Sequence, residues 1–467
     1  MAAEAAANVG RFLWAPQAWM PGGWQAGVLL GIGADGCWTE VATGVDADQA
    51  PAGTERSRGP LLPGLVDAHS HAFQRAFAGA AERRESASDD FWSWRDRMYG
   101  VALRIGPAEL RAVAAQLYVE LLRGGYTHVC EFHYLQRDRD GSDYADPLAM
   151  SWALADAAAD AGIGLTILPV LYERAGFAAT ALGDEQRRFR ASAAEVVAAA
   201  RRIGAGARPH VDAGLAIHSL RGADAASIDD LRRLAEGVAG PIHIHVAEQT
   251  GEVDDCLRAT GCRPIEWLAR GGRLDARWQL VHATHATPAE IDAVAASGAG
   301  IVLCPGTEAN LGDGLADLPR WLGGGVPITI GSDSQATRDW REELRLLEYG
   351  QRSSLRRRNI AAAPEQGLAS TAERLWSRVL GGSAAASGRS SWGLVKGARA
   401  DALVIDIDDD GLLGVAPDRV LDALVFSSPQ APWRDVMVAG RWQLRGGRHA
   451  AQAAIAARCR EAMAEIG

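Results

Sequence analysis

Two histidines separated by one residue, His69 and His71, begin the part of the sequence with the clearest chemical signal. On a β-strand, residues two apart point to the same side, so both imidazoles can bind one metal ion. Imidazole is a common zinc ligand, and a catalytic zinc takes about three or four protein ligands plus water. Such a pair is often accidental, but an apolar segment that is entered through Pro63 and Gly64 precedes it. This context favours a metal site.

Two further segments carry histidines at the ends of apolar runs. His245 and Glu248, three residues apart, can supply a metal ligand and an acid or base from one strand end. His243 also points inward and could be a ligand, a residue that supports a ligand, or a buried core histidine. His282 follows a short apolar run and suits a role as a general base or in orienting water. We interpret His285, three residues further on, as structural or supporting.

Asp333 lies in the segment Gly331-Ser-Asp-Ser334, after another apolar run. A carboxylate here can bind a metal and accept a proton from its water. Aspartate and serine are also favoured as helix N-caps, and for Asp333 alone that interpretation would prevail. Together with the three histidine segments, the position favours a metal ligand.

The elements that must position these groups form a regular alternation. Apolar runs recur along the chain, each followed by a stretch with helical spacing; in 108–123 the apolar residues fall on one helix face and Gly124 ends the helix. The pattern predicts eight parallel strands in a (β/α)8 TIM-type barrel, an α/β fold whose active sites lie at the carboxyl ends of the strands. The expected strands are 61–68, 127–131, 164–170, 214–217, 241–246, 279–281, 301–303 and 328–330.

Both ends of the chain differ from this pattern. Residues 1–60 are rich in glycine, tryptophan and short apolar runs, and a similar texture returns at 401–406 and 435–440. We expect a small β-sandwich domain formed from both chain ends. The predicted division is 1–60 for its N-terminal part, 61–384 for the barrel, and 385–467 for its C-terminal part with a terminal helix.

Composition limits the possible functions. The 467 residues carry a formal net charge of −10, which argues against nucleic acid as the main partner. Lys396 is the only lysine among 48 basic residues, so Schiff-base and P-loop chemistry are not expected before that position. The sequence has no visible signal peptide and no apolar stretch long enough for a membrane span. Its six scattered cysteines indicate reduced thiols, so we expect a cytoplasmic protein without membrane contact.

The order of these motifs resembles the amidohydrolase superfamily: HxH after the first barrel strand, a histidine after the fifth, another after the sixth, and an aspartate after the eighth. Many members hold two metals bridged by a carboxylated lysine from the fourth strand, but here that strand ends in His218 and the barrel contains no lysine. The resemblance therefore implies the one-metal deaminases. It implies one Zn²⁺, with iron or manganese as alternatives, held by His69, His71, His245 and Asp333. Glu248, His282 and Asp333 are the implied catalytic residues.

Longer motifs are similar to those of the formimidoylglutamate deiminases within that superfamily. They are the segments 69–79, 92–99, 131–134 and 218–221. The resemblance implies a small dicarboxylate substrate, N-formimino-L-glutamate, and a homodimer. Its implied substrate-binding residues are Gln74, Arg95, Tyr134, His218 and Arg221. Arg97 competes with Arg95 for one role, and residues 136–138 depart from the family pattern, which expects further histidines there.

Two alternatives remain open. Another one-zinc aminohydrolase, acting on a nucleobase or a guanidino acid, would use the same metal site with a less cationic pocket. A non-catalytic scaffold could keep the barrel, but such proteins typically lose ligands, and none is lost here. The native metal, the oligomeric state and the choice between the formimino substrate and close guanidino or carbamoyl analogues stay undetermined by the sequence.

Overall fold

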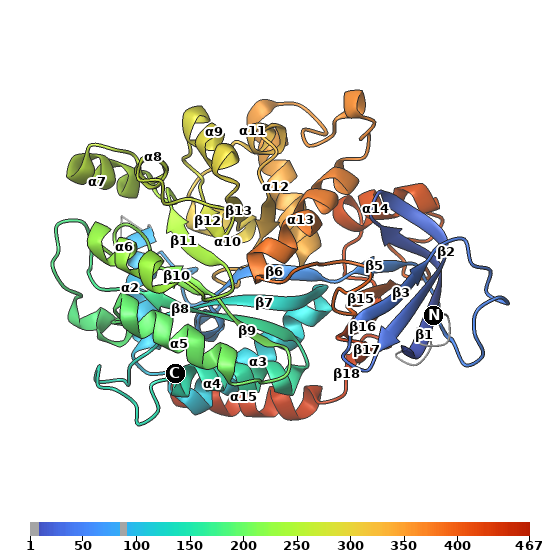
Figure 1. Cartoon of the computed structure of the whole chain (residues 1–467), viewed down its shortest axis with the longest axis horizontal. Coiled ribbons are helices and arrows are strands. Elements are labelled where there is room, and N and C mark those ends of the chain that lie inside the picture. Colours follow the sequence, from blue (N-terminus) through green and yellow to red (C-terminus); the bar gives the residue numbers. More distant parts are fainter. Residues whose placement is uncertain (1–8, 85–90) are drawn as a thin grey trace.

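The computed structural model describes residues 9–84 and 91–467, in which two sheets dominate (Figure 1). Eight parallel strands form a barrel, and every residue in them is buried, which explains why they appear in the sequence as short apolar runs. In spatial order they are β6 (Leu65–Ser70), β7 (Tyr126–His133), β8 (Gly164–Leu171), β10 (Leu215–Ile217), β11 (Ile242–Val246), β12 (Trp278–His282), β13 (Gly300–Leu303) and β14 (Ile328–Ile330). The short strand β9 (Val211–Ala213) pairs with β8. All eight expected strands are present, and the (β/α)8 prediction is confirmed.

The run expected as one strand over 61–68 is two strands in different sheets. β5 (Leu61–Pro63) pairs with β1 and β15 of the terminal sheet, whereas β6 begins the barrel. Gly64 lies between them, and a Cβ there would come within 2.2 Å of the Thr127 hydroxyl. A continuous apolar run thus hides a change of sheet, because both halves are buried and local periodicity cannot separate them.

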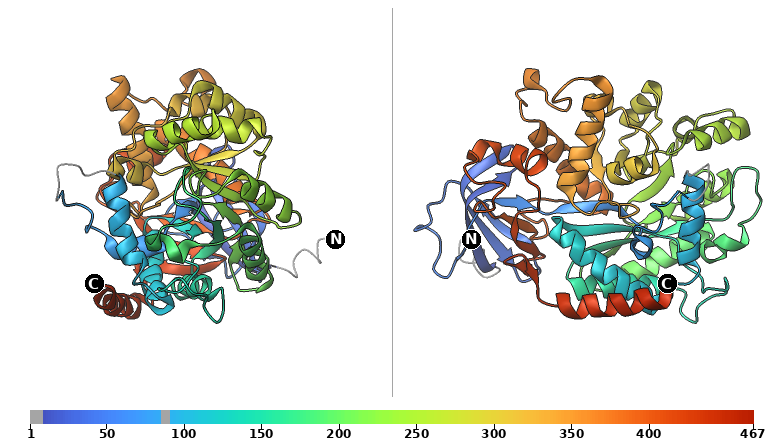
Figure 2. Two further views of the ribbon diagram at one scale, coloured as in Figure 1. Left: turned by 90° about the vertical axis from the view of Figure 1, so that its left-hand side faces the viewer. Right: turned by 180° about the vertical axis from the view of Figure 1, so that it is seen from behind.

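Helices alternate with the barrel strands and cover the outside of the barrel (Figures 1 and 2). The helix predicted over 108–123 is α3 (Pro107–Arg123), and the N–H of Gly124 closes it on the carbonyl of Glu120 at 3.0 Å. The others around the barrel are α4 (Ala149–Ala161), α5 (Ala193–Ala205), α6 (Ala225–Leu234), α7 (Thr250–Thr260), α8 (Pro264–Arg270), α9 (Pro288–Ser297), α10 (Pro305–Leu311), α11 (Leu318–Gly323), α12 (Trp340–Leu355) and α13 (Thr371–Ser387).

Two helical segments follow β6, where a barrel keeps its active-site loops. They are η1 (Ala72–Phe77), a 3₁₀ turn that begins directly after His71, and α2 (Phe91–Ala102). A further 3₁₀ turn, η2 (Asp184–Phe189), follows β8. These insertions form the walls above the strand ends.

The two ends of the chain form a second sheet, as expected (Figure 1). Most of its neighbouring strands are antiparallel, and they enclose an apolar cluster of their own that includes Leu30, Trp38 and Val404. In spatial order they are β3 (Trp38–Ala42), β2 (Gly23–Gly33), β1 (Val9–Met20), β5, β15 (Ala402–Ile405), β16 (Trp433–Val438), β17 (Arg441–Arg445) and β18 (Arg448–His449), with β4 (Glu55–Arg56) on β1. The division at 61 and 385 stays a prediction.

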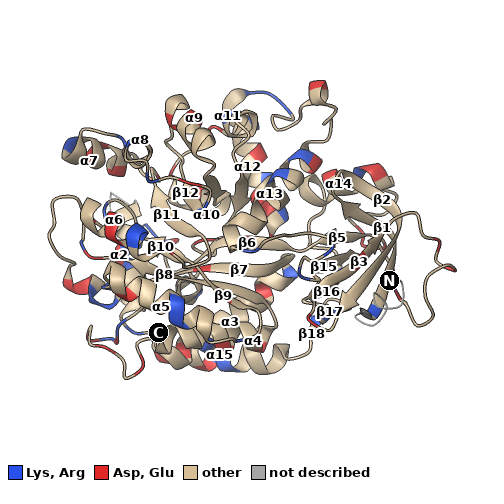
Figure 3. Ribbon diagram, viewed as in Figure 1, with Lys and Arg blue, Asp and Glu red and all other residues tan. Residues whose placement is uncertain are grey.

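The chain returns to the barrel after this sheet. Of the remaining α-helices among the described residues, α14 (Val420–Phe426) lies between β15 and β16 in the sequence. After the sheet comes α15 (Gln452–Ile466), which lies along α3 on the outside of the barrel (Figure 2). Acidic and basic residues are interspersed over the outer helices and loops (Figure 3). Every helix among the described residues is too short or too polar to cross a lipid bilayer.

Candidate metal and active site

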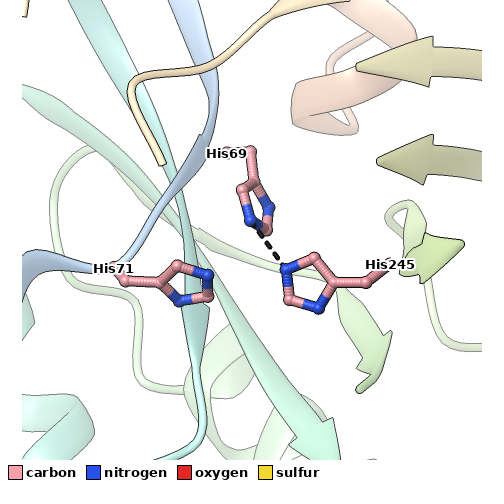
Figure 4. Close-up of side chains that lie close together, drawn as sticks. All are labelled: His69, His71 and His245. Atoms are coloured by element: carbon pink, nitrogen blue, oxygen red, sulfur yellow. Dashed lines mark hydrogen bonds between the residues drawn. The ribbon is translucent and has the colours of Figure 1, made fainter. Parts of the chain in front are cut away.

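Three histidine rings meet at the carboxyl ends of β6 and β11 (Figure 4). Nε2 of His69 lies 3.0 Å from Nε2 of His245, and His71 offers a nitrogen within 4.8 Å of both. The backbone orients two of these rings. Nδ1–H of His71 donates to the Phe132 carbonyl at 3.0 Å, and Nδ1–H of His245 donates to the His218 carbonyl at 2.9 Å. Both rings therefore turn an unprotonated Nε2 toward the cluster.

The spacing and protonation of this cluster fit one divalent metal ion. Zinc–nitrogen bonds of roughly 2.0–2.1 Å bring the ligand nitrogens of one ion to about 3–3.5 Å from each other. Asp333 adds an oxygen, since its Oδ1 lies 3.4 Å from Nε2 of His71 and 3.6 Å from Nε2 of His69. Burial lowers the pKa of His69, His71 and His245, which keeps the rings neutral, as metal ligands must be.

The backbone is strained where two of the candidate groups enter the site. φ is +68° at His282 and +47° at Asp333, in the left-handed region that crowds any side chain. Ala247 and Ala283 share this conformation, with φ of +51° and +50°. Such strain persists only where the surrounding structure holds it, and it concentrates at functional sites. Here it accompanies the turns that end β11 and β12 and that follow β14.

Glu248 and His282 lie beside the cluster as a pair of titratable groups. Nε2 of His282 is 3.9 Å from Oε1 of Glu248 and 3.6 Å from Oδ2 of Asp333, and its Nδ1 is 3.3 Å from Oε1 of Glu308. Burial raises the pKa of Glu248 to about 7. Burial alone would lower the pKa of His282, but the three carboxylates outweigh it and raise that pKa to about 10. Both groups can therefore hold a proton near neutral pH.

A cavity opens beside these groups. Aromatic side chains and two guanidinium groups form part of its lining. Arg95 lies 4.6 Å from the centre of the Trp92 ring, and Nη2 of Arg221 is 3.7 Å from Oε2 of Glu248. The Nε of each arginine is buried without a hydrogen-bond partner among the described residues. The lining includes His71, Phe91, Trp94, Arg95, Met98, Tyr99, Tyr134, Tyr172, Phe189, His218, Arg221, His245, Glu248, His282 and Asp333.

Arg95, rather than Arg97, faces this cavity. Although both are on α2, Arg97 turns away and donates to the carbonyls of Ala81 and Arg83 at 2.9 and 2.8 Å. The two positions are two residues apart on a helix and so cannot share a face. The geometry of α2 thus decides which of the two arginines lines the cavity, a choice that the sequence alone left open.

Of the other expected substrate-binding residues, two line the cavity and one does not. Tyr134 and His218 line the cavity, and the His218 ring stacks on Tyr172 with centroids 3.9 Å apart. Gln74 is absent from the lining; it donates from Nε2 to the Tyr134 hydroxyl at 3.1 Å and faces an adjacent cavity with Gln335. Gln74 therefore reaches the site through Tyr134.

Two buried carboxylates that were not expected hold the strand ends in place. Asp67 accepts from the N–H and the hydroxyl of Ser332 at 2.9 and 2.6 Å. Glu131 accepts from Ser70 Oγ at 3.0 Å and from the N–H of Ala72 at 2.6 Å. Asp67 and Glu131 stand inside apolar runs that precede candidate residues, and this unusual placement is the signal that could have revealed them.

Glu308 and Tyr172 were also missed. Glu308 is on the first turns of α10, directly after β13, where a carboxylate at the carboxyl end of a barrel strand could have been noted. Tyr172 follows β8 in the same way. No histidine or repeated motif marks either position.

The remaining histidines at strand ends serve elsewhere. His133 ends β7 but lines a separate cavity with Arg137 and Glu195. His243 is buried and bonds from Nε2 to the Ala386 carbonyl at 3.0 Å, away from the metal-donor cluster. His285 lies in the loop after β12, where its N–H donates to the Ala247 carbonyl at 3.0 Å.

Comparison with known proteins places this arrangement in a family. Formimidoylglutamate deiminase from Pseudomonas aeruginosa is 44% identical over 450 residues, covering 94% of this chain and 96% of that protein. The crystal structure of an amidohydrolase from Brucella melitensis has a TM-score of 0.91 and 41% identity, over 98% of this chain and 99% of that one. An adenosine deaminase from Xanthomonas campestris with bound zinc shares the fold, with a TM-score of 0.79 at 23% identity over 97% of this chain and 98% of that one. The model of the amidohydrolase family matches residues 61–443, and the chain therefore belongs to the amidohydrolase family.

Proposed function

We propose that this protein hydrolyses N-formimino-L-glutamate to N-formyl-L-glutamate and ammonia, a step in histidine degradation. One observation carries the proposal: a single cavity joins the His69, His71, His245 and Asp333 cluster to two arginines, Arg95 and Arg221, whose Nε atoms are buried without a partner among the described residues. The substrate has a cationic, amidine-like head and two carboxylates. Within one cavity, the carboxylates of Glu248 and Asp333 can face the cationic head, and the two guanidinium groups can bind the substrate's carboxylates.

We infer that His69, His71, His245 and Asp333 hold one Zn²⁺, with iron or manganese as alternatives for a site of this type. A metal in this position supplies the nucleophile, because it makes water acidic enough to lose a proton near neutral pH. Neutral imidazoles and one carboxylate would leave half of the positive charge of such an ion uncompensated, which favours that ionisation.

The chain's own groups then handle the protons. Asp333 can accept the proton that the attacking water loses, and His282, whose Nε2 lies 3.6 Å from Oδ2 of Asp333, can help to orient that water. Glu248, whose pKa burial raises to about 7, is partly protonated at neutral pH and can pass a proton to the imino nitrogen. Water adds to the formimino carbon, and the protonated nitrogen leaves as ammonia. Glu308, bonded to Nδ1 of His282, keeps that ring oriented.

The two carboxylates of the substrate call for cationic donors with a fixed geometry. Guanidinium groups bind carboxylates in a planar and often bidentate manner. Arg95 is held against the Trp92 and Tyr99 rings, and Arg221 near Phe91. Both side chains therefore lose little conformational entropy when they bind a substrate. Tyr134 and His218 supply further polar contacts, with Gln74 acting through Tyr134.

Ammonia release from a substrate panel tests this function. The enzyme reconstituted with zinc should act on formiminoglutamate, and far less on guanine, cytosine, adenosine or guanidino and carbamoyl analogues. Preference for a nucleobase would overturn the substrate assignment but keep the aminohydrolase chemistry. A purified protein without bound metal and without metal-dependent activity would support the non-catalytic scaffold instead. We further propose a cytoplasmic homodimer, which sedimentation of the purified protein would test.

A further inference from the structure

The two oxygens of Asp333 face different groups. Oδ1 faces the histidine cluster, 3.4 Å from Nε2 of His71, whereas Oδ2 faces away from it, 3.6 Å from Nε2 of His282. One carboxylate thus stands between two sets of possible metal ligands. The proposed reaction uses one set to hold the metal and leaves part of the second unexplained.

The unexplained member of the second set is Cys304. This fully buried thiol directly follows β13, at the N-cap of α10, and its backbone N–H donates to Oε1 of Glu308 at 2.8 Å. Its Sγ, a ring nitrogen of His282 and an oxygen of Asp333 all lie within 4.8 Å of one another. The proposed reaction gives this thiol no role.

We propose that His282, Cys304 and Asp333 form a second, inhibitory site for a thiophilic divalent cation, Zn²⁺ or Cd²⁺, which shares Asp333 with the first site. One nitrogen, one sulfur and one oxygen donor are a set typical of these ions. On binding, the S–H bond of Cys304 and the Nε2–H bond of His282 break, both protons leave to solvent, and the sulfur and the nitrogen each form a bond to the metal.

Charge around the second site favours a cation. Oε1 of Glu308 lies 3.3 Å from Nδ1 of His282, and Oδ2 of Asp333 lies 3.6 Å from its Nε2, so two carboxylates adjoin the second site. A metal ion in the first site leaves part of this negative charge uncompensated. An ion in the second site would hold His282 and Asp333 and so stop the proposed proton transfers. Inhibition therefore rests on the proposed function, whereas binding of the second ion does not.

Cadmium binding to the resting enzyme tests the site directly. The partly exposed thiols are first removed by Cys37→Ser and Cys262→Ser, and the protein is loaded with one equivalent of zinc. Titration with Cd²⁺ should add one cadmium per chain without releasing zinc, and should produce a thiolate-to-cadmium charge-transfer band in the ultraviolet. Cys304→Ser in this background should lose the band and bind the second ion at least about tenfold more weakly.

The matched control is Cys256→Ser in the same background, because that buried thiol contacts Thr260 and lies outside the cluster. It should keep the band. Cys304→Ala provides a second variant if the serine variant folds poorly. A band that survives the loss of Cys304, or cadmium that simply replaces the zinc, would overturn the proposal. Excess Zn²⁺ should also inhibit turnover, and Cys304→Ser should raise the inhibitory concentration by the same factor as it weakens binding. A failed substrate assay would leave the binding result intact.

Discussion

The backbone N–H of Asp333 donates a 2.9 Å hydrogen bond to the carbonyl of His69, and the N–H of His71 returns one of 3.2 Å to the carbonyl of Asp333. This isolated bridge joins the last barrel strand to the first. The seam that closes the barrel therefore consists of the residues proposed to bind the metal. The hydrogen bonds that close the barrel are therefore also the ones that bring the proposed metal ligands together.

Gly331→Ala tests this coupling. A Cβ at Gly331 would come within 2.7 Å of both Cβ and the carbonyl oxygen of His69, so the two strands must separate at the seam. We expect a loss of about 1–3 kcal/mol in stability and a clear loss of metal affinity, measured by denaturation and by metal titration. Gly323→Ala is the control: it lies at the end of α11 with open space around it and should gain about 1 kcal/mol. Unchanged metal affinity in Gly331→Ala would show that metal binding does not depend on the contacts at the seam.

His245→Ala should abolish metal retention. Its Nε2 faces His69 at 3.0 Å, and its loss removes one of four proposed ligands. We expect metal affinity to fall by more than about 100-fold and activity to disappear, as elemental analysis and ammonia release can measure. His243→Asn, which changes a buried histidine two residues away that bonds to Ala386, should retain its metal. Full metal content in His245→Ala would exclude it as a ligand.

Glu248→Gln should keep the metal and lose turnover. The amide preserves the shape of the side chain but cannot carry the proton, so kcat should fall about 10²- to 10⁴-fold. Metal content and thermal stability of the same preparation serve as internal checks. Glu236→Gln, on the surface after α6, should behave as the unchanged protein. Near-normal turnover in Glu248→Gln would contradict the proton transfer that we assign to Glu248.

Arg95→Gln should weaken substrate use without affecting the metal. Loss of a charged hydrogen bond costs about 1.5–3 kcal/mol, which corresponds to roughly 10- to 100-fold in kcat/KM. Arg97→Gln, on the same helix but bonded to backbone carbonyls, should leave kcat/KM nearly unchanged. Steady-state kinetics on formiminoglutamate compare the two. Equal effects would mean that α2 supports the cavity as a whole and that Arg95 has no separate role.

Stability should fall with rising pH through a buried carboxyl of α12. Burial raises the pKa of Glu343 to about 8, although Thr337 and the N–H of Gly306 donate to it. The folded state then keeps a proton that the unfolded state releases above about pH 4.3, so stability declines between that pH and about 8. Glu343→Gln should flatten the decline by up to about 1.4 kcal/mol per pH unit. Unfolding by urea from pH 5.5 to 8.5 measures the difference, and parallel curves would refute the shifted pKa.

Much of this arrangement follows from local sequence. The eight strands could be predicted because parallel strands buried on both faces are short apolar runs, and the helices between them have a different period. His69, His71, His245, His282 and Asp333 could be predicted as a group because each follows such a run, and the carboxyl ends of parallel strands meet on one face. These signals depend only on neighbours in the chain.

Only the tertiary structure decided which of the available groups meet. His243 and His245 have the same parity in one strand, yet only His245 reaches the metal-donor cluster, while His243 bonds to Ala386 of α13. Arg95 faces the cavity because of the orientation of α2, and Cys304 lies near Asp333 because β13 and β14 are neighbours. Each outcome depends on packing between segments far apart in the chain, and a pattern of local periodicity carries no information about such contacts.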